Sequence, residues 1–202
     1  MNVTFKHPDG TKDTFECEGD QYILDAAEES GGVALLMINV EDQFLPVEEF
    51  THLYKMMMSY NILWESSKIV DDTPENVNRN MQMVHFFYDR HAPVDKTIEV
   101  LYPVLQKVQP CAMIKCKANL VMGTDRLVEH GMHVDVLDAE DRPYIKTSIL
   151  YMNTCDGYTA FEDGTKVESV ANRFVTFPNG MKHTGTSTTN ASFRMVINFN
   201  YV

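Results

Sequence analysis

The stretch SFRMVINFNYV, residues 192–202, says most about the fold of this chain. Apolar and polar side chains alternate in it, which is typical of a β-strand because successive side chains point to opposite faces. One face is apolar throughout: Phe193, Met195, Ile197, Phe199 and Tyr201. The other face carries Arg194, Val196, Asn198 and Asn200. On that face Arg194 either points to water or lies inside a barrel, where its planar fork would need a carboxylate.

Short strand-like runs fill the part of the chain that leads to this strand. They are CAMIKCKANLVM (111–122), HVDVLD (133–138), YIKTSILYMN (144–153) and RFVTFP (173–178), with turn signals between them. The preceding segment, 37–108, begins with a strand and turn and then shows helical patterns over 47–60, 73–89 and 93–108. Helices followed by many short strands predict an α+β fold, in which a sandwich or barrel over 111–202 is braced by N-terminal helices.

The first 32 residues have a pattern of their own. NVTFKH and KDTFECE alternate around the turn signal PDGT, and QYILDAAEES follows as an amphipathic helix, so we predict a small β-hairpin plus helix appendage. The segment resembles the start of plant-type 2Fe-2S ferredoxins, but their Cys-x4-Cys-x2-Cys loop does not follow. Cys111 and Cys116 have the first spacing, yet Asn119 stands at the third position. We therefore interpret both as buried strand cysteines, and the resemblance leaves a ferredoxin-type docking partner as its functional implication.

The charge balance excludes some classes of partner. The 202 residues contain 29 acidic and 17 basic side chains, a net charge of −12, and no basic stripe is interleaved with aromatics. Such a chain repels a phosphate backbone, so we expect no nucleic-acid partner. No apolar run approaches the roughly 20 residues that a membrane span needs, and the first residues lack the apolar core of a signal peptide. We expect a soluble, cytoplasmic protein.

A candidate metal site follows from EHGMHVDVLD, residues 129–138. His133 and Asp135 are two apart, so on a strand they share a face, and Gly131 disfavours a helix there. A further histidine, His183, follows the strand and turn FVTFPNGMK. Two histidines and one aspartate on neighbouring strands can hold one face of a non-haem Fe(II) ion. Taken singly, each residue also fits an ordinary solvated turn or surface loop.

Together, His133-x-Asp135, His183 and Arg194 resemble the Fe(II)/2-oxoglutarate-dependent oxygenase family in order and spacing. The likeness is to its prolyl 4-hydroxylase-like branch, which includes small versions carried by phages and marine bacteria. FLPVEEFTHL (44–53), KTSILYMN (146–153) and GYTAFEDGTKV (157–167) are similar to its entry helix, a central strand and its Gly-rich turn. The resemblance covers residues 37–202 and implies a double-stranded β-helix, or jelly roll. Asn200 departs from it, since many relatives have a tryptophan there.

The resemblance implies a reaction and a set of roles. His133, Asp135 and His183 would bind Fe(II), and the distal carboxylate of 2-oxoglutarate would pair with Arg194. Tyr151 would assist through its hydroxyl, with Thr147 on the same face, and Lys117 and Asn119 are candidates for substrate contact. O2 would be consumed, succinate and CO2 released, and a C–H bond of a peptidyl proline or small metabolite hydroxylated, with ascorbate as an accessory reductant. Residues 61–91 are a candidate lid. The alternatives are a ferredoxin-related docking or electron-transfer module and a non-catalytic metal-binding jelly-roll protein.

Overall fold

The computed structural model describes residues 2–6, 12–16, 38–71, 73–136 and 144–202, in two compact units, Met1–Met37 and Ile38–Val202. In the first unit, β1 (Asn2–Lys6) pairs antiparallel with β2 (Lys12–Glu16), which confirms the predicted hairpin. The predicted helix that follows, QYILDAAEES, lies outside the described residues. Among the described helices, none has the length and apolar character to cross a membrane.

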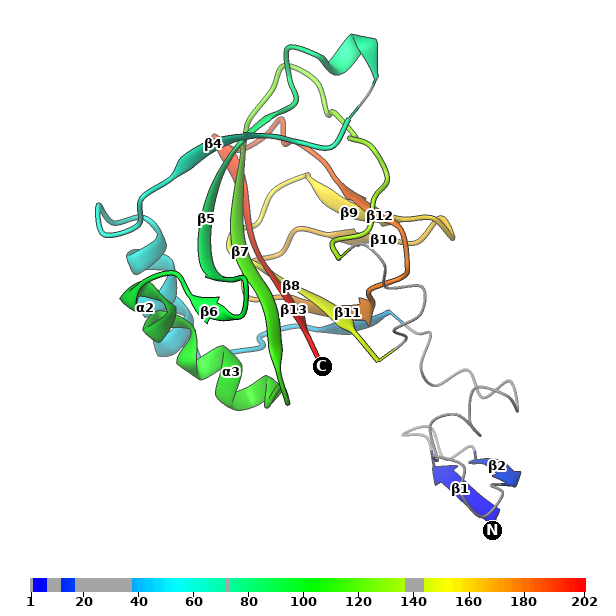
Figure 1. The fold of residues 1–202 in the computed structure, drawn as a ribbon. Coiled ribbons are helices and arrows are strands. Elements are labelled where there is room, and N and C mark those ends of the chain that lie inside the picture. Colours follow the sequence, from blue (N-terminus) through cyan, green and yellow to red (C-terminus); the bar gives the residue numbers. More distant parts are fainter. Residues whose placement is uncertain (1, 7–11, 17–37, 72, 137–143) are drawn as a thin grey trace. The chain divides into compact units, whose positions relative to one another are not determined.

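Two antiparallel sheets build the second unit (Figure 1). The larger has the strand order β3 (Asn39–Glu41), β11 (Phe174–Pro178), β8 (Lys146–Tyr151), β13 (Phe193–Tyr201), β7 (Met113–Met122), β5 (Met81–Asp89) and β4 (Glu65–Lys68), with β6 (Ala92–Pro93) paired to β5. The smaller has the order β10 (Lys166–Glu168), β9 (Tyr158–Phe161) and β12 (His183–Gly185). This mostly antiparallel arrangement agrees with the expected jelly roll.

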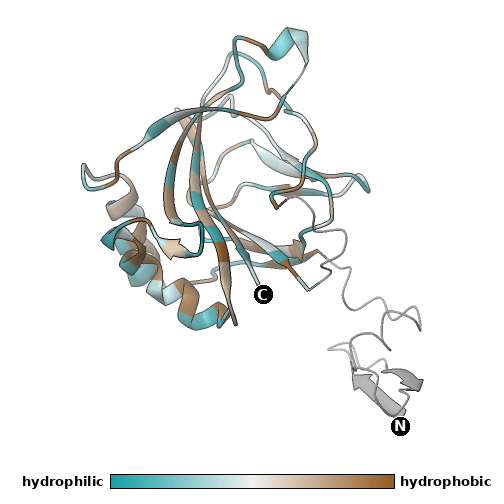
Figure 2. Ribbon diagram, in the orientation of Figure 1, coloured by the Kyte–Doolittle hydropathy of each residue, from teal (hydrophilic) through white to brown (hydrophobic). Residues whose placement is uncertain are grey.

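The two faces of β13 pack into different clusters, as the alternation in its sequence predicts. Met195, Ile197, Phe199 and Tyr201 belong to a cluster that also contains side chains of α2 (Val47–Met57) and α3 (Tyr102–Val108). On the opposite face, Val196 joins a second cluster with Phe161 of the smaller sheet. The strands are accordingly banded in apolar and polar colours (Figure 2). The larger sheet therefore has one side toward the helices and the other toward the smaller sheet.

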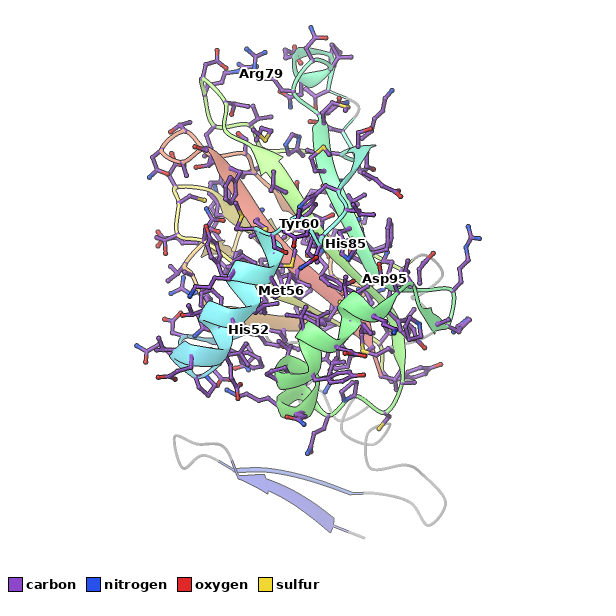
Figure 3. The ribbon with its side chains drawn as sticks, turned by 90° about the vertical axis from the view of Figure 1, so that its left-hand side faces the viewer. His52, Met56, Tyr60, Arg79, His85 and Asp95 are labelled. Atoms are coloured by element: carbon purple, nitrogen blue, oxygen red, sulfur yellow. The ribbon has the colours of Figure 1, made fainter. Side chains whose placement is uncertain are left out.

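The helices cover the outer face of the larger sheet (Figure 3). α2 begins after Pro46, as predicted, and buries Leu53 and Met57. The predicted helix over 93–108 is present as a 3-10 helix, η3 (Lys96–Leu101), that continues directly into α3. Pro103 stands in the first turn of α3, where its missing N–H costs no intrahelical hydrogen bond.

The helix predicted over 73–89 is wrong. Thr73 and Pro74 start only the single 3-10 turn η2 (Pro74–Asn76), and MQMVHFFYD forms β5 instead. β5 pairs with β4 on one side and β7 on the other, and its β-branched and aromatic side chains suit a sheet between two neighbours. Within 61–91, the candidate lid, β4 and β5 are thus strands of the larger sheet. The bracing segment 37–108 likewise contributes β3, β4, β5 and β6 as well as helices.

Two smaller predictions also need correction. HVDVLD does not form a strand over its described residues, because only His133 makes an isolated β-bridge and a bend follows. Cys111 is exposed and precedes β7, whereas Cys116 is buried within β7 as expected.

Candidate functional site

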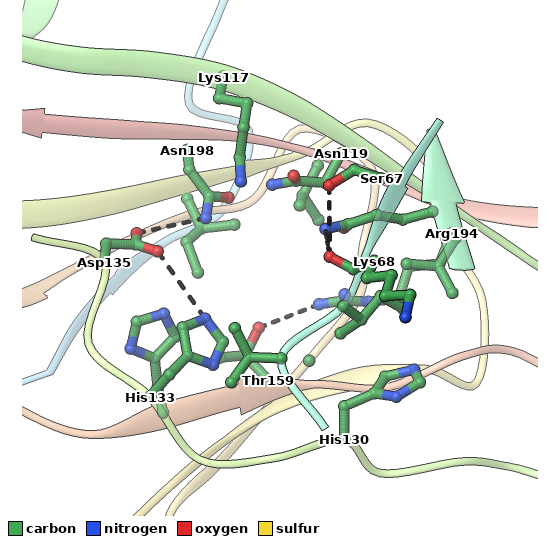
Figure 4. A pocket seen from close by; sticks show the side chains of 18 of the residues that line it. Ser67, Lys68, Lys117, Asn119, His130, His133, Asp135, Thr159, Arg194 and Asn198 are labelled. Atoms are coloured by element: carbon green, nitrogen blue, oxygen red, sulfur yellow. Dashed lines mark hydrogen bonds and ion pairs between the residues drawn. The ribbon is translucent and has the colours of Figure 1, made fainter. Parts of the chain in front are cut away.

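A cavity of about 240 Å³ lies between the two sheets (Figure 4). The larger sheet supplies most of its floor, through inward-facing side chains of β7 and β13. β9, β12 and the segment 130–135 supply the opposite wall, and residues 67–70 close one end. The volume is below the range of about 300–1,000 Å³ typical of ligand pockets, so a ligand must be small or enter only in part.

His133, Asp135 and His183 meet at this cavity. One ligand atom from each lies within 4.8 Å of the others. The backbone brings the histidines together, because His133 and His183 exchange two hydrogen bonds of 3.0 Å across an isolated bridge, and their ring centroids are 5.0 Å apart. His133 Nε2 lies 3.9 Å from Asp135 Oδ1. The structure thus brings together the three residues that the sequence predicted to converge.

Both histidine rings are oriented for metal binding by backbone carbonyls. His133 Nδ1 lies 3.0 Å from the Gly131 carbonyl, and His183 Nδ1 lies 3.3 Å from the Met181 carbonyl. A carbonyl only accepts, so each Nδ1 carries the proton and each Nε2 presents a lone pair. Burial lowers the pKa of His183, which favours this neutral form.

Asp135 is held as a carboxylate. Burial raises its pKa, but the charges of His183, Lys115 and His133 and a hydrogen bond from Asn200 outweigh burial, so the net shift is downward. Asn198 Nδ2 and Asn200 Nδ2 lie 3.4 and 3.3 Å from Asp135 Oδ2. A carboxylate beside two imidazole nitrogens is a donor set that suits ferrous iron.

A chain of polar side chains supports Asp135 from behind. Asn200 Nδ2 also donates to Thr147 Oγ1 at 3.0 Å, and Thr147 donates to Asn179 Oδ1 at 3.0 Å. Asn179 in turn bonds both the N–H and the carbonyl of Val136, at 3.2 and 3.0 Å. Thr147, a sequence candidate for co-substrate contact, thus lies in the network behind the aspartate and does not line the cavity.

Replacing Asn200 with alanine should therefore weaken metal binding about 10- to 100-fold, the usual cost of losing a group that orients a ligand. The expected measurement is a titration of the metal-free protein with Fe(II) under argon. Asn61→Ala, on the exposed turn after α2, is the matched control and should bind like the wild type. Equal affinity of the Asn200 variant and the wild type would show that Asp135 is oriented without it.

Arg194 is buried at the other end of the cavity, with 4% of its surface exposed. Its Nη2 donates to Thr159 Oγ1 at 3.0 Å, while its Nε has no partner among the described residues. A Cβ added at Gly157 would meet Arg194 Cδ at 2.6 Å, and one at Gly185 would meet Nη1 at 3.1 Å, so both glycines make room for the guanidinium. Burial lowers the pKa of Arg194, as expected for a cation that has lost its hydration. A buried guanidinium with an unpartnered Nε can bind an anion.

Tyr151 supports Arg194 from within the second hydrophobic cluster. Its ring centroid is 5.5 Å from the guanidinium carbon, and its hydroxyl donates to Thr159 Oγ1 at 2.8 Å. Thr159 lines the cavity, whereas Tyr151 does not. The threonine thus accepts hydrogen bonds from both Tyr151 and Arg194.

The sequence candidates for substrate contact, Lys117 and Asn119, both line the cavity. Several other lining residues were not predicted. Lys115 could have been found, because it alternates with Lys117 and Asn119 in IKCKAN. Nothing in the sequence pattern pointed to Lys68, Thr159 or His130. His130 Nδ1 lies 3.1 Å from the carboxylate of Asp71, which is outside the lining.

The residues present fit a metal ion. Two ligands held at about 2.1 Å in adjacent positions are separated by about 3 Å, so ligand atoms that lie within 4.8 Å of one another need to close by no more than about 2 Å. The donor set has a carboxylate and two imidazoles whose lone pairs are freed by carbonyl hydrogen bonds. Such a set occupies one face of the ion and leaves the opposite positions open to other ligands.

Comparisons with known proteins identify the fold. No protein-family model and no curated protein matches the chain. Among solved structures, a 2OG-Fe(II) oxygenase-family oxidoreductase from Burkholderia pseudomallei is 13% identical, with a TM-score of 0.59 over 93% of each chain. A prolyl hydroxylase from Trichoplax adhaerens, in complex with a hypoxia inducible factor peptide fragment, is 14% identical, with a TM-score of 0.59 over 92% of this chain and 95% of that one.

A third similar structure is the non-haem, alpha-ketoglutarate-dependent epimerase SnoN from nogalamycin biosynthesis, 11% identical with a TM-score of 0.60. The similarity covers 89% of this chain and 83% of the epimerase chain. None of these three is a ferredoxin, so the ferredoxin resemblance of residues 1–32 gains no support from them. At these identities the likeness concerns the fold, and the chain has the jelly-roll fold of the 2OG-Fe(II) oxygenases.

Proposed function

We propose that this chain is an Fe(II)- and 2-oxoglutarate-dependent dioxygenase that hydroxylates a C–H bond. The convergence of His133, Asp135 and His183 in a cavity that also contains the buried Arg194 carries the proposal. The fold likeness to oxygenases supports it. Bound Fe(II) would supply the O2 activation that couples decarboxylation of 2-oxoglutarate, to succinate and CO2, with hydroxylation of the substrate.

The protein side chains provide binding, orientation and shielding. His133, Asp135 and His183 would hold the metal at the cavity. Arg194 pairs through its fork with the distal carboxylate of 2-oxoglutarate, which satisfies the unpartnered Nε. Tyr151 and Thr159 hold the guanidinium in place, and Thr147 with Asn200 holds Asp135. The sheets around the site keep bulk water away from the reacting groups.

A peptidyl proline and a small metabolite are the two substrate classes we consider, and the Trichoplax adhaerens neighbour was solved with a peptide fragment. Ascorbate would serve such an enzyme as an accessory reductant.

The test is optical. Protein with Fe(II) under argon should develop a weak visible charge-transfer band when 2-oxoglutarate is added, because a keto acid chelated to ferrous iron absorbs there. Under air the same sample should form succinate slowly without added substrate. No band would reject the proposed function, and a band without succinate would favour a metal-binding jelly-roll protein that is not an enzyme.

A further inference from the structure

The cavity floor beside Asp135 is cationic and rich in amides. β7 and β13 are neighbours, with Lys117 opposite Asn198 and Lys115 opposite Asn200. Figure 4 shows the Lys117 side chain entering the cavity between Asn198 and Asn119. A sheet face between two hydrophobic layers usually carries apolar side chains, so this row of polar residues indicates a ligand.

The charge of the cavity is opposite to that of the chain. Its lining includes the cations Lys68, Lys115, Lys117 and Arg194, and Asp135 is the one carboxylate that the described residues contribute. The whole chain has a net charge of −12. A concave site with the opposite sign attracts anions locally.

A single 2-oxoglutarate dianion paired with Arg194 does not account for the positive charge of the cavity lining. Arg194 lies four residues before Asn198 on β13, which is about 14 Å along a strand. Lys117 faces Asn198 and therefore lies near the metal end, away from the guanidinium. Lys115 is already engaged, since its Nζ donates to the Asp135 carbonyl at 2.8 Å. Lys117 thus remains as a separate cation.

Lys117 and its neighbours have unmet hydrogen-bonding capacity. Across the described ranges, no carboxylate lies within ion-pair distance of Lys117, whose ammonium lies 5.8 Å from the Phe86 ring. Burial lowers the pKa of Lys117, although Asp135 acts in the opposite direction. Asn119 Oδ1 and Asn198 Oδ1 are buried without a partner in the described structure. A bound group with acceptors for the ammonium and donors for the amide oxygens would satisfy all three.

We propose that Lys117, together with Asn119 and Asn198, forms a subsite for a carboxylate of the primary substrate. The substrate is then a small carboxylic acid with a nearby donor, such as an amino acid, or an acidic side chain of a peptide, and not a neutral prolyl peptide. This inference rests on the proposed dioxygenase function and adds the substrate class to it.

The experiment compares acids with their isosteric amides. Calorimetric titrations under argon, with Fe(II) and 2-oxoglutarate present, would use the free amino acids and their amides, and blocked tripeptides centred on Glu, Gln or Pro. In the wild type we expect at least one acid to bind about 10-fold or more tightly than its amide, because a charge-assisted hydrogen bond is lost in the amide. Preference for a free acid would identify a metabolite, and preference for the Glu peptide would identify a protein side chain.

Two variants make the test specific. Lys117→Gln should abolish the preference for the acid, whereas Lys55→Gln, on the exposed face of α2, should keep it. The inference fails if no acid binds better than its amide, or if the preference survives in Lys117→Gln. It also fails if Lys117→Gln weakens 2-oxoglutarate binding as much as loss of Arg194 does, since Lys117 would then hold the co-substrate. Absence of the charge-transfer band in the wild type would instead mark failure of the proposed function.

Discussion

Replacing His133 with alanine should abolish the charge-transfer band and reduce succinate formation to background. Loss of a group that only orients a ligand costs about 10- to 100-fold in metal affinity, so loss of the ligand itself should cost at least about 100-fold. The remaining pair, Asp135 and His183, has no substitute nearby in the described residues, because the metal-ligating cluster contains only these three. The measurements are Fe(II) titration under argon, the band after addition of 2-oxoglutarate, and succinate formation under air.

The matched control for this variant is His52→Ala. His52 is exposed on α2, on the far side of the larger sheet from the cavity, so its loss should leave the metal affinity and band unchanged (Figure 3). His133 is partly exposed and its one side-chain hydrogen bond among the described residues is to the carbonyl of Gly131, so the variant should fold. Similar charge-transfer bands in the wild type and in His133→Ala would contradict the assignment of His133 as a metal ligand.

Replacing Arg194 with alanine should weaken 2-oxoglutarate binding and leave Fe(II) binding intact. A hydrogen bond to a charged group contributes about 1.5–3 kcal/mol, which corresponds to a loss of about 10- to 150-fold in affinity. Arg194→Lys should recover only part of the loss, because an ammonium keeps the charge but lacks the fork that matches a carboxylate. The amplitude of the charge-transfer band as a function of 2-oxoglutarate concentration measures both effects.

Truncation of a buried arginine also leaves a cavity, so folding must be checked separately. Arg194 packs against Gly157 and Gly185, and the thermal unfolding midpoint of the variant shows how well that space is tolerated. Fe(II) affinity serves as an internal control, and Arg126→Ala, at an exposed position, is the external one. If 2-oxoglutarate bound the folded Arg194 variant as it binds the wild type, the guanidinium would have another ligand.

Several features could be predicted from residues alone because they depend on local periodicity. The alternation in β13 placed Arg194 and Asn198 on the face opposite Phe199, and the structure confirms that division. Pro46 marked the start of α2. The spacing of His133 and Asp135, followed by His183, predicted a convergence that the cavity now contains.

Other features depended on which segments become neighbours. MQMVHFFYD follows good helix-start signals, yet it is a strand because β4 and β7 satisfy its backbone on both sides. His133 needed no regular strand to reach the site, since the bridge to His183 positions it. The hydroxyl of Tyr151 bonds Thr159, and Thr147 lies behind Asp135, which strand alternation could not show.

The sequence by itself determined the sheet-rich class, the faces of β13 and the identity of the metal-ligand candidates. Those properties follow from the side-chain period of a strand and the chemistry of each residue, both of which are local. Only the tertiary structure decided that Lys117 shares a cavity with Arg194 and that Asn200 holds Asp135. Such contacts arise from pairing between segments far apart in the chain, and the free energy of that pairing depends on the whole core and not on any one stretch.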